Sequence, residues 1–416
     1  MQMLEINSKR QLNGSLKIHG AKNSVLPILC ATVLVNGVSV IHKCPYLSDV
    51  EVTLNILKYL GARVYRSGET VVVDSRNISR SNILEQYMSE LRSSIIFLGA
   101  LASRTGEACL FLPGGCEIGL RPIDLHLKGL KSLGYNVFTN GHDVCAVREN
   151  PQSAEIVLPF PSVGATENII LASVFNKGKT TVINAAREPE IADLVSFLNK
   201  AGAKIYGAST PTITVQGVNS LHSVEHTVIP DRILASTMIS ACAACSGKIE
   251  LSDVDVSHLL PTKAVFEEMG CSFKTFKSSI IVKAPKRPNR VRFIETMAYP
   301  GFPTDSQAPV MAALTVANGT SVIKENIFEN RFRHAEQLNL FGADITVNDK
   351  FAIVNGVSQL HNADAKCTDL RGGAAVVIAA LTADGKSRIR DIHHIDRGYE
   401  KIENQLSQLG ADIKRI

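Results

Sequence analysis

The sequence lacks any long uninterrupted hydrophobic segment. Its N-terminus, MQMLEINSKRQLNGS, does not contain the apolar core of a signal peptide, and no later apolar run reaches the ~18 residues that a membrane-spanning helix needs. Runs of Lys and Arg of the kind found in basic tails are also absent, and the formal net charge of +5 is a mild bias. These absences argue against secretion, membrane insertion and nucleic-acid binding, and they predict a cytoplasmic protein.

Cysteine is present, but not in a pattern that indicates disulfides or a metal site. The nine cysteines are an odd number, scattered mostly through apolar segments, so we expect reduced thiols. Cys242 and Cys245 form one C-x-x-C, yet no second pair of Cys or His accompanies them. We therefore predict that these two small residues pack on a helix.

What the sequence does contain is an internal repeat. Hydrophobic residues make up 45% of the 416 residues and charged residues 20%, which is typical of a folded protein with two or three domains. A glycine ends an apolar run and precedes a strand-like segment six times, at intervals of 69, 72, 69, 72 and 66 residues. These glycines are Gly37, Gly106, Gly178, Gly247, Gly319 and Gly385.

Each repeat contains a second glycine, in a pattern typical of a helix end followed by a strand, as in YLGARVY around Gly61. One repeat is therefore an apolar helix, a strand, an amphipathic helix and further strands, which is an α/β alternation. The first helix of each repeat, such as NSVLPILCATVLV, is apolar on nearly every face and must be surrounded by other elements. Six repeats divide most simply into two domains of three, with a boundary near 228–231.

Charged and polar residues gather where the apolar helices begin. Helix N-termini carry a partial positive charge and unpaired N–H groups, so several of them together suit a multiply charged anion. Helix capping is the alternative explanation for the Ser, Asp and Thr residues, but it does not explain cations at these positions. The residues concerned are Lys22, Asn23, Arg92, Ser162 to Asn168, Asp231, Arg232, Asp305, Asp369 and Arg371.

Several motifs resemble, in order and spacing, those of the UDP-N-acetylglucosamine enolpyruvyl transferases (1-carboxyvinyltransferases) of the EPSP synthase-like family. They are GAKNSVLPIL, LPGGCEIGLRPIDLHLKGL, SVGATEN, NAAREPEI, FPTDSQA, IFENRF, TDLRGGAA and HHIDRGYE. The resemblance implies an α/β fold of two inside-out α/β barrel domains, with six repeats of a βαβαββ-like unit around buried central helices. It implies one domain over 22–229, a second over 1–21 plus 230–416, and an active site in the cleft between them.

The same resemblance implies the reaction and its residues. The enolpyruvyl group of phosphoenolpyruvate passes to the 3-hydroxyl of UDP-N-acetylglucosamine, with release of phosphate, in the first committed step of peptidoglycan synthesis. Cys116 matches the family's proton-donating cysteine, and Asp305 resembles the base that accepts the sugar's proton. Lys22, also catalytic, is expected with Arg121 and Arg397 to hold phosphoenolpyruvate.

Further positions match the family's nucleotide-sugar contacts and supporting residues. The expected sugar-nucleotide contacts are Asn23, Arg92, Arg121, Pro122, Ile123, Asp124, Leu125, Ser162, Val163, Gly164, Asp305 and Ile327. The supporting residues are His126, Asp231 and Arg371. The resemblance implies no metal ion and no cofactor.

Three positions depart from the family's pattern: Glu117 beside the loop cysteine, and Leu234 and Ser236 after the domain boundary. Two other functions therefore stay open beside the transferase. One is a catalytically silent paralogue that binds nucleotide sugars, and the other is the same chemistry on a different acceptor.

Overall fold

The computed structural model describes residues 2–8, 11–111 and 123–416. The described chain forms two compact units. One, the 20–229 unit, comprises residues 20–111 and 123–229, and the other, the 230–416 unit, also contains the N-terminal residues up to His19.

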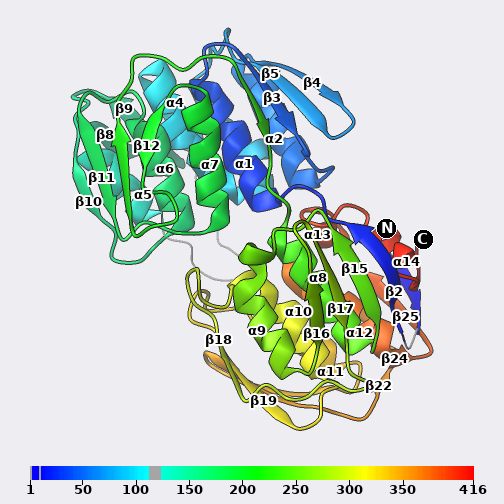
Figure 1. The fold of residues 1–416 in the computed structure, drawn as a ribbon. Helices are drawn as coiled ribbons and strands as arrows, with labels where there is room; N and C mark the ends of the chain where they lie inside the picture. The colour runs from blue at the N-terminus through cyan, green and yellow to red at the C-terminus, as the bar shows by residue number, and fades with distance from the viewer. Residues whose placement is uncertain (1, 9–10, 112–122) are drawn as a thin grey trace. The chain divides into compact units, whose positions relative to one another are not determined.

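The 20–229 unit carries three four-stranded sheets among its described residues, and all three have one topology (Figure 1). The first two strands of each sheet are parallel, and the remaining pairs are antiparallel. In spatial order the strands are β14 (Val224–Thr227), β3 (Val38–His42), β5 (Thr70–Asp74) and β4 (Arg63–Ser67); β6 (Asn82–Ile83), β7 (Glu107–Phe111), β9 (Asp143–Arg148) and β8 (Tyr135–Asn140); β10 (Glu155–Val157), β11 (Lys179–Ile183), β13 (Thr212–Gln216) and β12 (Lys204–Tyr206).

The 230–416 unit repeats this topology. Its sheets are β2 (Asn13–Lys17), β15 (Lys248–Ser252), β17 (Ser279–Lys283) and β16 (Ser272–Thr275); β18 (Phe293–Glu295), β19 (Thr320–Lys324), β21 (Phe351–Asn355) and β20 (Asp344–Asn348); β23 (Asp364–Lys366), β25 (Lys386–Arg390), β1 (Leu4–Asn7) and β26 (Asp412–Arg415). This unit also contains a two-stranded parallel sheet formed by β22 (Leu360–His361) and β24 (Ala383–Asp384). The N-terminal strands β1 and β2 thus complete sheets of this unit, as the family resemblance implies.

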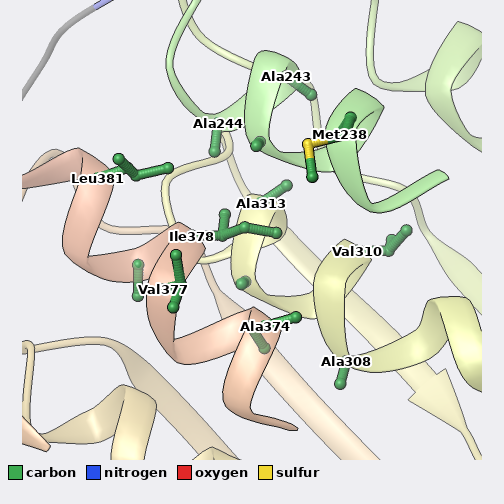
Figure 2. Packing of buried hydrophobic residues seen from close by; sticks show 14 of the residues in the cluster. Met238, Ala243, Ala244, Ala308, Val310, Ala313, Ala374, Val377, Ile378 and Leu381 are labelled. Atoms are coloured by element: carbon green, nitrogen blue, oxygen red, sulfur yellow. The ribbon is translucent and has the colours of Figure 1, made fainter. Parts of the chain in front are cut away.

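The apolar helices lie at the centre of each unit, with sheets around them (Figure 1). They are α1 (Lys22–Ala31), α4 (Phe97–Thr105) and α6 (Val163–Ser173) in one unit, and α8 (Arg232–Ala244), α10 (Thr304–Leu314) and α12 (Leu370–Thr382) in the other. Helices α8, α10 and α12 pack against one another, with Met238, Ala313 and Ile378 converging between them (Figure 2). The prediction of buried central helices is therefore confirmed, because residues on all their faces contact protein.

A second helix in each repeat joins the strands. These helices are α2 (Ser48–Leu60), α5 (Asp124–Ser132), α7 (Pro189–Lys200), α9 (Leu260–Glu268), α11 (His334–Asn339) and α14 (Ile402–Gln408). Gly61 caps α2 with a φ of 108°, a left-handed conformation that glycine adopts without steric cost. The remaining helical pieces are α3 (Glu85–Glu90), α13 (His393–Asp396), η1 (Thr32–Leu34), η2 (Arg92–Ile96) and η3 (Val256–Leu259). Among the described helices, none is long and apolar enough to cross a membrane.

The expectation of reduced thiols is wrong for one pair. Cys109 of β7 and Cys145 of β9 form a disulfide. The two residues are direct cross-strand partners, 4.2 Å apart at Cα, as in a non-hydrogen-bonded antiparallel pair. The strand register brings them together across 36 residues, and no local sequence pattern signals that register.

Cys242 and Cys245 behave as predicted. Both are free thiols buried in or at the end of α8, and burial raises the pKa of Cys242 to about 12. They pack as small residues of the core.

Candidate active site

Asp305 lies in the first turn of α10, where two buried arginines hold its carboxylate. Arg331 donates from Nη2 to Oδ1 over 2.8 Å, and Arg371 donates from Nη2 to Oδ2 over 3.0 Å. The two arginine side chains are 4% and 3% exposed, whereas that of Asp305 is 26% exposed. The two arginines therefore fix the orientation of the carboxylate, while the Asp305 side chain stays partly exposed.

Arg371 is itself embedded among groups that favour its charge. Burial works against the guanidinium, but Tyr399, Asp305 and Asp231 outweigh it and raise the pKa of Arg371. The guanidinium carbon lies 5.3 Å from the centre of the Tyr399 ring, and the Tyr399 hydroxyl is 2.9 Å from Thr237 Oγ1. Arg371 is thus a permanently charged, rigidly placed partner of Asp305.

Two further aspartates cap the neighbouring central helices. Asp231 Oδ1 accepts hydrogen bonds from the N–H groups of Ile233 and Leu234 at the start of α8. Asp369 Oδ1 accepts from the N–H groups of Arg371 and Gly372 at the start of α12. The capping explanation is therefore correct for these two residues.

Ile327 and Arg397 belong to the same unit as Asp305. Ile327 is half-buried in the segment after β19, and its N–H donates to Glu325 Oε1 over 2.8 Å. Arg397 is the C-cap of α13, a helix that packs against α12.

Lys22 begins α1 in the 20–229 unit and pairs with a buried carboxylate. Its Nζ lies 2.6 Å from Asp49 Oδ2 of α2, and both side chains are buried. Asp49 explains why a cation is tolerated at this helix start, since the dipole alone would disfavour it. Asn23 follows on the same turn.

The starts of α5 and α6 lie next to one another in this unit. Asn168 of α6 donates from Nδ2 to His126 Nδ1 of α5 over 3.0 Å, so the proton of the neutral ring is on Nε2. Burial lowers the pKa of His126 to about 4. A Cβ on Gly164 would lie 3.1 Å from His126 Cε1, so the backbone of α6 rests against this imidazole.

Other predicted residues occupy these same helix starts. Ser162 caps α6, accepting from the N–H of Ala165 over 3.3 Å, and Val163 follows it. Ile123 is the N-cap of α5, which begins with Asp124 and Leu125. Arg92 begins η2. Cys116, Glu117, Arg121 and Pro122 lie outside the described residues.

The predicted site residues are therefore divided between the two units. Asp231, Asp305 and Arg371 come together in the 230–416 unit, whereas Lys22 and the α5 and α6 starts belong to the 20–229 unit. Sequence reasoning missed Asp49, Arg331 and Tyr399, although the motifs IFENRF and HHIDRGYE contain the last two. In the described part of the chain, no group of three or more His, Cys, Asp or Glu is arranged to hold a metal ion.

Comparison with known proteins identifies the family. The profile of EPSP synthase (3-phosphoshikimate 1-carboxyvinyltransferase) matches residues 6–406. The chain belongs to the EPSP synthase family. Within this family it is 47% identical, over the full length of both chains, to UDP-N-acetylglucosamine 1-carboxyvinyltransferase 2 of Caldanaerobacter subterraneus subsp. tengcongensis. It is 44% identical, over all of this chain and 99% of the relative, to UDP-N-acetylglucosamine 1-carboxyvinyltransferase of Finegoldia magna.

Solved structures of family members share the fold. The enolpyruvyl transferase NikO from Streptomyces tendae superposes with a TM-score of 0.91 at 26% identity, covering 100% of this chain and 98% of that one. EPSP synthase from Acinetobacter baumannii superposes with a TM-score of 0.76 at 16% identity over the whole of both chains. The predicted fold class, two inside-out α/β domains built from repeats, is confirmed.

Proposed function

We propose that this enzyme transfers the enolpyruvyl group of phosphoenolpyruvate to the 3-hydroxyl of UDP-N-acetylglucosamine and releases phosphate. Full-length identity of 47% to a relative named for this activity supports the acceptor. The observation that carries the chemistry is Asp305, a partly exposed carboxylate held on both oxygens by buried arginines. The reaction is the first committed step of peptidoglycan synthesis, and since both substrates are cytoplasmic metabolites we place the enzyme in the cytoplasm.

Asp305 acts as the base in this proposal. Its side chain is 26% exposed, so the sugar hydroxyl can reach it and transfer its proton to the carboxylate. Cys116 supplies a proton to the methylene carbon of phosphoenolpyruvate, by resemblance to the family. The sugar oxygen bonds to C2 of the alkene as C3 gains the proton, and the tetrahedral adduct then loses phosphate from C2 and a proton from C3, which restores the double bond.

Cationic residues hold the anionic substrate. Lys22, Arg121 and Arg397 bind the phosphate and carboxylate of phosphoenolpyruvate, and the starts of α5 and α6 bind the nucleotide sugar. Helix N-termini suit the diphosphate because their first N–H groups have no carbonyl partner within the helix. The supporting residues do not bind the substrates in this proposal but hold other site residues in place; they are His126, Asp231 and Arg371.

Phosphate release by the purified protein tests the proposal. We expect release from phosphoenolpyruvate that requires UDP-N-acetylglucosamine, with one enolpyruvyl sugar nucleotide formed per phosphate. Binding of the sugar nucleotide without release would indicate the silent paralogue. Release that requires a different hydroxyl acceptor would indicate the same chemistry with another specificity.

A further inference from the structure

Glu325 is a buried carboxylate at the end of β19, and its partners join two parts of the candidate site. The residue is 1% exposed. Oε1 accepts from the N–H groups of Ile327 over 2.8 Å and of Phe328 over 3.2 Å, while Oε2 accepts from Thr304 Oγ1 over 2.9 Å. Thr304 immediately precedes Asp305 at the start of α10.

None of the ion pairs found among the described residues includes Glu325, so hydrogen bonds alone compensate its burial. Such charge-assisted bonds are stronger than neutral ones, and a buried carboxylate that loses a donor is costly. The 325–328 turn and the first turn of α10 are therefore joined through one side chain.

Phe328 of this turn contacts Arg331, whose guanidinium carbon lies 5.3 Å from the ring centre, whereas the contacts of Asn326 lead away from Asp305. Asn326 N–H donates to Thr296 Oγ1 over 2.9 Å, and its side chain donates to Glu295 Oε1 over 2.8 Å, both at the end of β18. These bonds fix the turn to the sheet. Among the described contacts of Glu325 and Asn326, only the bond between Glu325 and Thr304 joins the turn to the helix that carries the proposed base.

We propose that Glu325 is a positioning residue for the sugar acceptor. It fixes Ile327, an expected contact of the nucleotide sugar, relative to Asp305, so that the 3-hydroxyl is presented to the base in one geometry. Small displacements of reacting groups lower rates strongly, so such a residue affects acceptor use without touching the substrate. This inference rests on the proposed function.

Thr304→Val tests the inference, because valine has nearly the shape of threonine but cannot donate to Glu325. We expect the KM for UDP-N-acetylglucosamine to rise about tenfold, as for one lost hydrogen bond to a charged group, while the KM for phosphoenolpyruvate changes less than about twofold. Thr304→Ser, which keeps the hydroxyl, should restore the KM for the sugar nucleotide toward that of the native enzyme.

Thr315→Val is the matched control. Thr315 is buried, follows the last residue of α10, and donates its hydroxyl to Ala312 O over 2.6 Å, so its substitution removes a hydroxyl from the far end of the same helix. It should leave both KM values close to those of the native enzyme, because it removes a hydroxyl from α10 without taking a donor from Glu325. Equal kinetics for the two variants, or an equal rise in both KM values, would overturn the inference.

Measurements of phosphate release and sugar-nucleotide binding by the native protein distinguish failure of this inference from failure of the proposed function. If it binds UDP-N-acetylglucosamine but releases no phosphate, the proposed function fails, and the inference is decided by calorimetric titration of the sugar nucleotide into native and Thr304→Val protein. A weaker Kd for the variant supports the positioning role. Equal Kd values, or no binding by the native protein, overturn it.

Discussion

At the scale of single residues, Asp305 shows how a charged group can be both anchored and reactive. The buried guanidinium groups of Arg331 and Arg371 occupy one lone pair on each oxygen and fix the plane of the carboxylate. Arginine suits this task because its planar fork holds one geometry and keeps its charge when buried. Because the Asp305 side chain is partly exposed, a substrate hydroxyl can reach it.

Asp305→Asn should lower kcat by about 100-fold or more, because an amide has nearly the same shape but cannot accept the proton. Binding of UDP-N-acetylglucosamine should weaken much less, which titration calorimetry would show. Asp364→Asn is the control, because it also removes a carboxylate that pairs with an arginine, Arg390, but at an exposed position on β23. It should leave kcat unchanged. A kcat within a few-fold of the native value would exclude Asp305 as the base.

His126 makes stability depend on pH. Burial lowers its pKa to about 4, whereas in the unfolded chain an imidazole titrates near ~6.5. The unfolded state therefore binds more protons between these values, and the free energy of unfolding falls as the pH drops from about 6.5 toward 4. The loss from this one group is about 2 kcal/mol by pH 5.

His126→Gln should reduce this acid sensitivity. Glutamine keeps an acceptor for Asn168 but does not titrate, so the stability difference between pH 7 and pH 5 should shrink by about 2 kcal/mol. Urea unfolding at the two pH values measures it. Identical losses in native and variant protein would contradict a neutral, buried His126.

At the scale of elements, glycines after helices decide where each repeat turns. Gly106 follows α4 with a φ of 90°, and Gly134 follows α5 with a φ of 84°. They differ in surroundings, because a Cβ on Gly106 would meet nothing within 4 Å, whereas one on Gly134 would lie 1.8 Å from Asn150 O.

This difference gives a matched pair of variants. Gly106→Ala should cost only the left-handed strain, about 1–2 kcal/mol. Gly134→Ala should cost clearly more, since the backbone at Asn150 must also move. Denaturant unfolding of both variants would show this order, and equal costs would mean that the backbone at Asn150 moves easily.

At the scale of the whole molecule, the N-terminus completes the second unit. Strand β1 lies between β25 and β26, and its Leu4 and Ile6 are fully buried in the core of that unit. The 230–416 unit is therefore incomplete without a segment more than 200 residues away in sequence.

Deleting residues 1–8 should destabilise the 230–416 unit selectively. The deletion removes an inner strand and leaves β25 and β26 with unpaired backbone groups, whereas the 20–229 unit loses nothing. Limited proteolysis with mass spectrometry should then yield a resistant fragment near residues 20–229. Equal resistance of the two units would show that β1 is dispensable.

The sequence by itself determined the repeat, the α/β class and the buried central helices, because glycine spacing and helices apolar on every face are local signals. It also pointed to Lys22 and Arg371, since cations at helix starts are unusual, and the family resemblance pointed to Asp305. The partners of these residues were decided only by the tertiary structure. Asp49, Arg331 and Tyr399 reach them from other elements, and Cys109 meets Cys145 through strand register. Such contacts depend on how distant segments pack, which no local pattern encodes.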